Sequence, residues 1–165
     1  MRNFFNQLKP KTFQTLCILM CLFGDLSFSG YMYYVFSDKD AYLQNYSLLK
    51  GPLSEAMKQQ GMSLPPGFEH EIFQIMLQTL LIMLSLFIIA HGIVYTFYYF
   101  QKRFAFLYIR FISFMGVLGA LLFTSSTISH NPIWGLNFLA VTIAYIFVIF
   151  GTYYFPIASK NKQEQ

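Results

Sequence analysis

The stretch IFQIMLQTLLIMLSLFIIAHGIVYTFYYF, residues 72–100, contains no Asp, Glu, Lys or Arg. As an α-helix it would be about 43 Å long, at roughly 1.5 Å per residue. The hydrocarbon core of a bilayer is about 30 Å thick, and roughly 20 apolar residues of helix cross it. The stretch therefore predicts a membrane-spanning helix that tilts or projects beyond the bilayer.

Three further apolar segments of spanning length occur in the chain, at residues 12–36, 104–124 and 133–155. The 165 residues are 56% hydrophobic and only 11% charged, whereas soluble domains are about 25% charged. We predict one all-α domain over residues 1–165, an integral membrane bundle of four transmembrane helices. A small helical loop, residues 37–71, would join the first two helices. The first segment exceeds signal-peptide length and no small-x-small cleavage site follows it, so we expect a retained helix.

Basic residues gather where the predicted helices meet one side of the membrane: Arg2, Lys9, Lys11, Lys102, Arg103, Lys160 and Lys162. The 37–71 loop on the other side carries five acids against three lysines. Because cytoplasmic loops are enriched in Lys and Arg, both termini are predicted to be cytoplasmic. We expect the chain in a cell membrane, with the bacterial inner membrane as the leading interpretation. The net charge of +4 comes from these flanking residues and does not indicate nucleic-acid binding.

The 37–71 loop contains start and stop signals for two short helices. Asp38 is a suitable N-cap, Gly51 would end the first helix, and Pro52 suits the first turn of a second helix that Gly61 would close. This loop either packs as a cap over the bundle or binds a partner. Asn45 begins a glycosylation triplet, which would be used only in a eukaryotic secretory membrane.

Each predicted span carries a stripe of small or polar residues. Lipid gives little hydrophobic reward for helix association, so close approach through small residues and buried hydrogen bonds replaces it. We therefore expect these stripes to face the bundle interior. They are Cys17, Cys21, Asp25 and Ser29; Gln78, Ser85, Gly92 and Tyr99; Ser113, Gly116, Ala120 and Thr124; and Asn137, Ala140, Ala144 and Gly151.

Asp25 lies near the middle of the first span, about 20 Å from its start. An unpaired charge at that depth costs at least about 2.5 kcal/mol, so this carboxyl group must be neutral, paired or hydrated. One interpretation is structural, in which Asp25 bonds to a neighbour and fixes the helix register. The other is functional, in which Asp25 and nearby groups carry a proton, an ion or a polar substrate.

Three other polar side chains within the spans are candidates for a cluster with Asp25. His91 and Arg110 lie about 12 Å and 10 Å from the cytoplasmic ends of their helices. Tyr145 lies near mid-membrane and is placed to donate a hydrogen bond to Asp25. Arg110 has the alternative of extending its side chain to the cytoplasmic interface. His91 is about 100° from Gly92 around the helix, so it faces either the first helix or an oligomer contact.

Common catalytic and cofactor signatures are missing from the sequence. Cys17 and Cys21 are four residues apart and form no C-x-x-C pair, and only His91 lies within a span, whereas a membrane b-type haem usually needs two His. Glu69, His70 and Glu71 point in different directions on a helix and chelate poorly. We therefore expect no catalytic residue, no resident metal and no cofactor.

These observations rank three functions. The first is a non-enzymatic subunit, assembly factor or interaction module of a membrane complex, with the lipid bilayer and other membrane proteins, or a second copy, as partners. The second is a small proton- or ion-coupled transporter or channel subunit that uses Asp25, His91 and Arg110. A membrane enzyme is the third.

Overall fold

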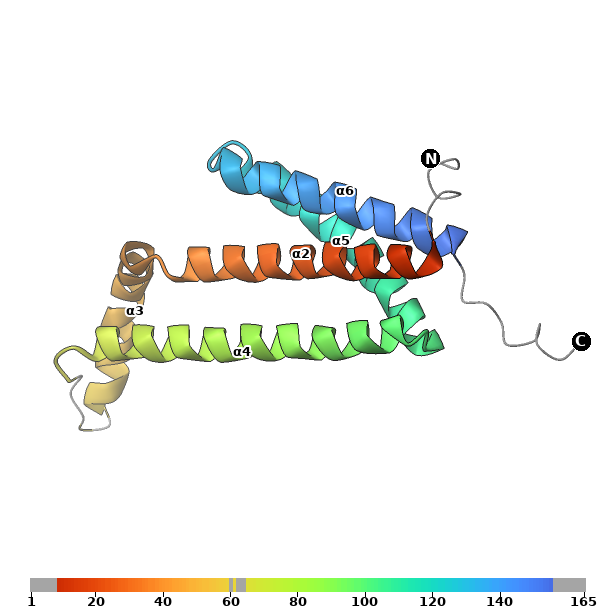
Figure 1. Ribbon diagram of the computed structural model, residues 1–165. Helices are drawn as coiled ribbons and strands as arrows, with labels where there is room; N and C mark the ends of the chain where they lie inside the picture. Colours follow the sequence, from red (N-terminus) through yellow and green to blue (C-terminus); the bar gives the residue numbers. More distant parts are fainter. Residues whose placement is uncertain (1–8, 60, 62–64, 156–165) are drawn as a thin grey trace, which may run out of the picture. The chain divides into compact units, whose positions relative to one another are not determined.

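The computed structural model describes residues 9–59, 61 and 65–155. This described part forms five helices and no strand: α2 (Pro10–Phe36), α3 (Lys39–Gln59), α4 (Phe68–Tyr99), α5 (Arg103–Thr127) and α6 (Pro132–Tyr154) (Figure 1). Helices α2, α4, α5 and α6 are long and apolar enough to cross a membrane. The all-α class and the four apolar helices of membrane-spanning length are therefore confirmed. Arg2, Lys160 and Lys162 lie outside the described residues.

Backbone contacts divide the chain into two compact units. Unit 1 comprises residues 1–28 and 88–165, and unit 2 comprises residues 29–87. Helices α2 and α4 each contribute one part to unit 1 and the other part to unit 2.

Unit 1 is built on the α5–α6 pair, whose backbones pack closely along their length (Figure 1). The turn before α6 is fixed by Asn131, whose side chain accepts a hydrogen bond from the Trp134 N–H at 3.4 Å, and by Pro132 in the first helical turn. The start of α2 packs against the end of α6, where the Phe13 ring stacks on Phe155 at 4.9 Å and covers Gly151. Any side chain larger than hydrogen at Gly151 would collide with this ring.

Unit 2 contains α3, which is one continuous helix through Gly51 and Pro52. The prediction of two short helices divided at Gly51 and Pro52 was therefore wrong. Pro52 lacks an N–H and so leaves the Leu48 carbonyl without its helical partner. The helix continues because only one backbone bond is lost, and Leu48 is exposed so that its turn is open to solvent or headgroups.

The beginning and the packing of α3 follow from a cap and an aromatic cluster. Asp38 accepts hydrogen bonds from the N–H groups of Asp40 and Ala41, both at 3.0 Å, so the predicted N-cap is confirmed. Tyr42 stacks on Tyr46 at 6.0 Å and packs on Phe73 at 4.9 Å, which ties α3 to the first turns of α4. Gly61 has the positive φ of 74° that is expected of a helix-terminating glycine.

The turn between α4 and α5 is unusually tight. The N–H of Gln101 donates to the Tyr98 carbonyl at 2.8 Å, and the N–H of Lys102 donates to the Phe97 carbonyl at 3.0 Å. This pair of bonds is a Schellman motif, which places one residue in the left-handed region. That residue is Gln101, with φ 58°, at a position that glycine usually occupies. The turn therefore carries local backbone strain.

Candidate functional site

Asp25 and His91 form a buried hydrogen-bonded pair inside unit 1. The Nδ1 atom of His91 lies 2.9 Å from the Oδ2 atom of Asp25. Both side chains are almost fully buried, with residue exposures of 3% for Asp25 and 5% for His91. Asp25 is about 22 Å along α2 from Pro10, and His91 is about 12 Å from the end of α4 at Tyr99. Two of the four candidate residues thus meet at membrane depth.

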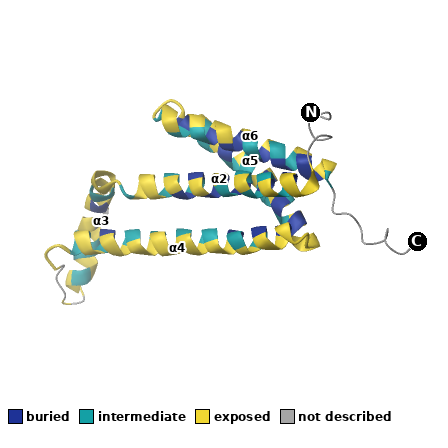
Figure 2. Ribbon diagram, in the orientation of Figure 1, coloured by how far each residue is buried: buried dark blue, intermediate teal, exposed yellow. Residues whose placement is uncertain are grey.

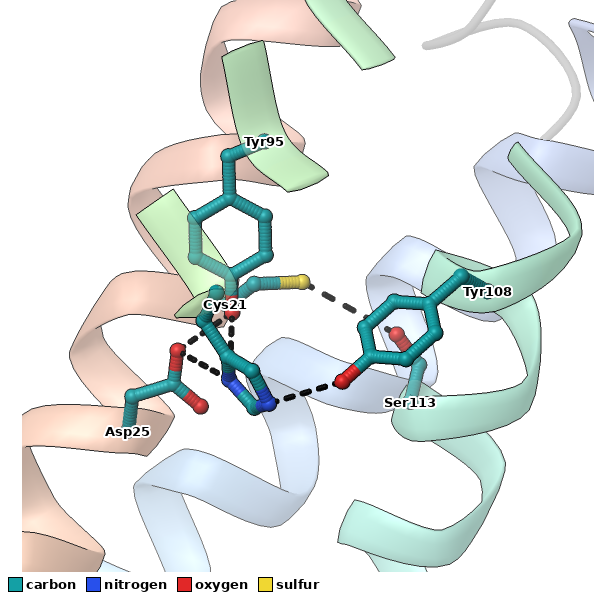
Figure 3. A network of polar contacts seen from close by, with 6 residues as sticks. Cys21, Asp25, Tyr95, Tyr108 and Ser113 are labelled. Carbon is teal, nitrogen blue, oxygen red and sulfur yellow. Dashed lines mark hydrogen bonds and ion pairs between the residues drawn. The ribbon is translucent and has the colours of Figure 1, made fainter. Parts of the chain in front are cut away.

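Two tyrosines complete the hydrogen bonds of this pair. The Tyr95 hydroxyl donates to the same Oδ2 atom of Asp25 and lies 3.5 Å from His91 Nδ1. On the other side of the imidazole, the Tyr108 hydroxyl is 2.8 Å from His91 Nε2. In Figure 3, Asp25, Tyr95 and Tyr108 converge from α2, α4 and α5. We call Asp25, His91, Tyr95 and Tyr108 the Asp–His–Tyr cluster.

Helix spacing explains how one helix supplies two of these groups. His91 and Tyr95 are four residues apart, so their side chains lie one turn apart on the same face of α4. Tyr98 continues this face and is also buried, at 2% exposure. The aromatic face of α4 therefore packs towards α2 and α5, and the imidazole is held edge-on against both tyrosine rings.

The cluster has two states of protonation that satisfy every contact. With Asp25 ionised and His91 neutral, Nδ1–H donates to Asp25 and Nε2 accepts from Tyr108. With one more proton the pair is neutral overall, and Nε2–H donates to the Tyr108 oxygen instead. The Tyr108 hydroxyl thus changes from donor to acceptor when one proton is gained. Tyr108 is half-buried, whereas the other three residues of the cluster are buried, so Tyr108 is the member nearest to the exterior.

Packing around the cluster is close on the side of α6. The Tyr145 ring fills the space beside Gly24 and Gly116, where an added Cβ would collide with it. We predicted a hydrogen bond from Tyr145 to Asp25, but none occurs among the described residues, and Tyr145 instead acts as a space-filling aromatic group. One turn away, the Cys21 thiol lies 3.9 Å from the Ser113 hydroxyl, and both side chains are fully buried (Figure 3).

Arg110 belongs to a different site. Its guanidinium Nη2 donates to the backbone carbonyl of Thr152 on α6 at 3.0 Å. The guanidinium carbon lies 4.2 Å from the Tyr153 ring centre and 4.9 Å from that of Phe106. The structure therefore does not bring Arg110 to Asp25, because the α6 terminus offers a carbonyl and two aromatic faces nearer to its own helix.

The predicted packing stripes have different environments. Within α2, Cys17, Cys21, Asp25 and Ser29 are all buried, as are Ser113 and Ala120 on α5. In contrast, a Cβ at Gly92 would meet no atom within 4 Å, Gln78 and Ser85 are exposed, and Tyr99 is half exposed. Figure 2 shows α4 as mainly exposed or intermediate. The small-residue stripe of α4 is thus not its packed face.

On α6 the buried face is shifted from the predicted stripe. Gly151 is buried, but Ala144 is intermediate and Ala140 is exposed. The buried positions include Phe138, Val141, Tyr145 and Val148. The contact face of α6 therefore combines bulky side chains with small ones, and Tyr145 on it fits against Gly24 of α2 and Gly116 of α5.

Sequence reasoning missed Tyr95 and Tyr108 as members of the cluster. The spacing of His91 and Tyr95 was a usable signal, since residues four apart share a helix face. Tyr108 carried no such signal, because its meeting with His91 depends on the angle at which α5 leaves the Gln101 turn.

Among residues 9–59, 61 and 65–155, no group of three or more His, Cys, Asp or Glu side chains is arranged to hold a metal ion. The searches for similarity found no protein family, no curated protein and no solved structure that matches this chain.

Proposed function

We propose that this chain is a non-enzymatic multi-pass membrane protein that acts as a subunit or interaction module of a larger membrane assembly. Its partner is a transmembrane helix of another membrane protein, which docks on one face of α4. We place both termini in the cytoplasm and the chain in a cell membrane, the bacterial inner membrane. Lys9, Lys11, Lys102 and Arg103, which flank the helix ends of unit 1, support this orientation.

The observation that carries the proposal is a pair of unpartnered polar side chains on α4. Gln78 and Ser85 are exposed, and neither makes a hydrogen bond to another described residue. They are seven residues apart, so they share a face within about 20°. Ser85 lies about 21 Å from the end of α4 at Tyr99, within the thickness of the hydrocarbon core. Polar side chains at such positions gain most from a hydrogen bond across a helix interface.

The rest of α4 supports the same interpretation. Only 6% of its most apolar 18-residue window is buried within the chain, against 39% for α6. The aromatic face with His91 and Tyr95 is occupied by α2 and α5, so the face with Gln78 and Ser85 is the one left for a partner.

The test is site-specific photocrosslinking in native membranes. A photoreactive phenylalanine analogue replaces Ser85 in one variant and Met83 in the matched control, which is also exposed but lies about 160° away around the helix. The proposal expects one discrete protein adduct from position 85 and lipid adducts alone from position 83. It also expects the purified complex to dissociate in a Gln78→Leu/Ser85→Ala variant.

Two outcomes contradict the subunit proposal. Equal adducts from positions 83 and 85 would mean that α4 is surrounded by lipid. An adduct only with a second copy of this chain would replace the heteromeric assembly with a homo-oligomer, and the mass of the native complex would distinguish the two.

The Asp–His–Tyr cluster favours a second candidate function, a proton-coupled transporter or channel subunit. The chain from Tyr108 through His91 to Asp25 is a continuous hydrogen-bonded path from a half-buried group to the deepest carboxyl group. Because Arg110 is engaged by α6, this candidate now depends on Asp25 and His91. Two residues along α2 from Asp25, the Ser27 hydroxyl donates to the Asn137 side-chain oxygen at 3.5 Å, beside an open groove of about 400 Å³.

The second candidate is tested by proton flux into proteoliposomes. Wild-type protein would acidify the vesicle interior under a membrane potential, and both Asp25→Asn and Tyr108→Phe would abolish the flux. The matched control is Ser113→Ala, which alters a neighbouring buried hydroxyl outside the path. Flux equal to that of empty vesicles in the wild type would eliminate this candidate.

A further inference from the structure

We propose that Arg110 is the centre of a binding site for the phosphate group of an anionic phospholipid, at the end of the bundle where α5 begins and α6 ends. The inference rests on the membrane-spanning character of the helices and not on the partner or proton proposals above.

The first step is that the positive charge of Arg110 is not neutralised by a carboxylate. A guanidinium group stays protonated at all relevant pH values. Within the described residues, Arg110 makes no ion pair. Asp25 is the only acidic residue described in unit 1, and it is paired with His91. The counter-charge of Arg110 must therefore come from outside the described chain.

The second step is the depth of the group. Arg110 is about 10 Å along α5 from Arg103, and its side chain leans back towards the start of the helix. The carbonyl that it binds, on Thr152, is two residues and thus about 3 Å from the end of α6 at Tyr154. The guanidinium group therefore lies at the level of the helix end, where phospholipid headgroups meet the hydrocarbon core.

The third step is that the group is held in place but not saturated. Phe106 and Tyr153 lie close to the guanidinium and restrict its orientation. One hydrogen bond goes to Thr152, and the Nε atom is buried without a partner. Arg110 as a whole is only half-buried, so part of its side chain is accessible from outside the bundle. A planar group with spare donors in a fixed orientation suits a phosphate better than a flexible lysine does.

The fourth step is the electrostatic setting. Lys9, Lys11, Lys102 and Arg103 flank helix ends of unit 1 and are exposed. Exposed basic residues attract anionic lipid through a long-range field that does not depend on any one of them and that salt screens. These residues draw anionic lipid to the surface in general, whereas Arg110 supplies the fixed and directional contact.

A purely structural role makes a different prediction. The α6 terminus leaves backbone carbonyls without helical partners, and a cation there is favourable by itself. If Arg110 serves only as this cap, removing its charge changes the stability of α6 but not the preference for one class of lipid. Lipid selectivity is therefore the measurement that separates the two roles.

The experiment is native mass spectrometry of the full chain released from nanodiscs that contain phosphatidylglycerol and phosphatidylcholine in equal amounts. Wild type should retain phosphatidylglycerol in preference to phosphatidylcholine. In Arg110→Gln, which keeps an amide donor but loses the charge, this preference should fall about fivefold, the effect of roughly one charged contact. The matched control is Arg103→Gln, an exposed arginine seven residues earlier on α5, which should change the preference less than twofold.

Several results would overturn the proposal. Equal losses in Arg110→Gln and Arg103→Gln would show that surface charge alone attracts the lipid. An unchanged preference in Arg110→Gln would leave Arg110 as a helix cap. Inorganic phosphate that binds wild type in pure phosphatidylcholine nanodiscs, and that displaces phosphatidylglycerol from mixed ones, would identify free phosphate as the ligand.

A second measurement covers the case in which Arg110→Gln does not fold. Lipids that remain bound to wild type through detergent purification are extracted and quantified against the lipids of the source membrane. The proposal expects enrichment of anionic phospholipid at about one molecule per chain, and an Arg110→Lys variant that keeps the charge should retain only part of it. Retained lipid with the composition of the bulk membrane would contradict the site.

Discussion

Asp25 and Arg110 are both ionisable groups in apolar helices, and their surroundings differ. Asp25 lies deep, and one imidazole and one phenol satisfy the same carboxylate oxygen. Arg110 lies near a helix end, has one carbonyl partner and no carboxylate. We attribute the difference to depth. A charge far from water must be paired within the protein, whereas a charge near the interface is also stabilised by lipid headgroups and water.

Removal of the deep carboxylate should produce the largest effect. In Asp25→Ala, His91 and Tyr95 lose their shared acceptor within a buried site. The free energy of unfolding should fall by about 3 kcal/mol or more, as for other broken buried pairs. Reversible unfolding in mixed detergent micelles measures it, and Asp25→Asn, which keeps a carbonyl acceptor, should lose less than half as much. A fully stable Asp25→Ala would mean that the pair does not hold the helices together.

The packing beneath the cluster should matter nearly as much as the pair. Gly116→Val would drive a side chain into the Tyr145 ring and should cost about 2 kcal/mol through overpacking. Gly119→Val, three residues along the same helix, is the matched control, because a Cβ there meets no atom within 4 Å. The same unfolding assay compares them. If both variants lose the same stability, the cost comes from a β-branched residue in α5 and not from Tyr145.

The shallow charge should contribute less to stability than the deep one. Arg110→Ala removes a cation and one hydrogen bond from the α6 terminus, so the free energy of unfolding should fall by about 1 kcal/mol. This loss should be at most a third of that in Asp25→Ala, measured in the same micelles. A loss of equal size would show that depth does not govern how the two charges are stabilised.

The smallest effect is expected at the turn that brings α5 back beside α4. Gln101→Gly relieves the left-handed conformation at φ 58° and should raise the free energy of unfolding by about 0.5 kcal/mol. Lys102→Gly is the control, since Lys102 has an ordinary extended conformation with φ −72° and should gain nothing. The comparison is made by thermal unfolding followed by circular dichroism. A loss of stability in Gln101→Gly would show that its side chain makes a contact that outweighs the strain.

Much of the fold was predictable because hydrophobic length determines membrane spans directly. The four spans and the Asp38 cap depend on local sequence, and the structure differs from them only by a few residues at helix ends. The division of α3 at Gly51 and Pro52 failed because breaker residues are weak signals inside an otherwise continuous helix.

The candidate site was predictable only in part. Asp25 and His91 were found because ionisable groups are rare and conspicuous in apolar segments. Their tyrosine partners are common at membrane borders, so Tyr95 and Tyr108 did not stand out among the 12 tyrosines of the chain. Arg110 could not be placed because its partner is a backbone carbonyl, and every residue has one.

The sequence of α4 also offered two candidate faces for packing against the other helices. The small residues that include Ser85 and Gly92 suggested one packed face, while His91, Tyr95 and Tyr98 formed another. The aromatic face was buried because it supplies both area and hydrogen bonds, which small residues do not.

The two cysteines of the chain have a practical consequence. Cys17 and Cys21 are both fully buried in α2, where Cys17 contacts Tyr98 of α4 and Cys21 contacts Ser113 of α5. A maleimide reagent reaches these sulfurs only when α2 separates from its neighbours. The rate of alkylation therefore measures how often this part of the bundle opens locally. No label needs to be introduced, because the two native cysteines report the opening. Any ligand or partner that holds α2 against its neighbours should slow their alkylation.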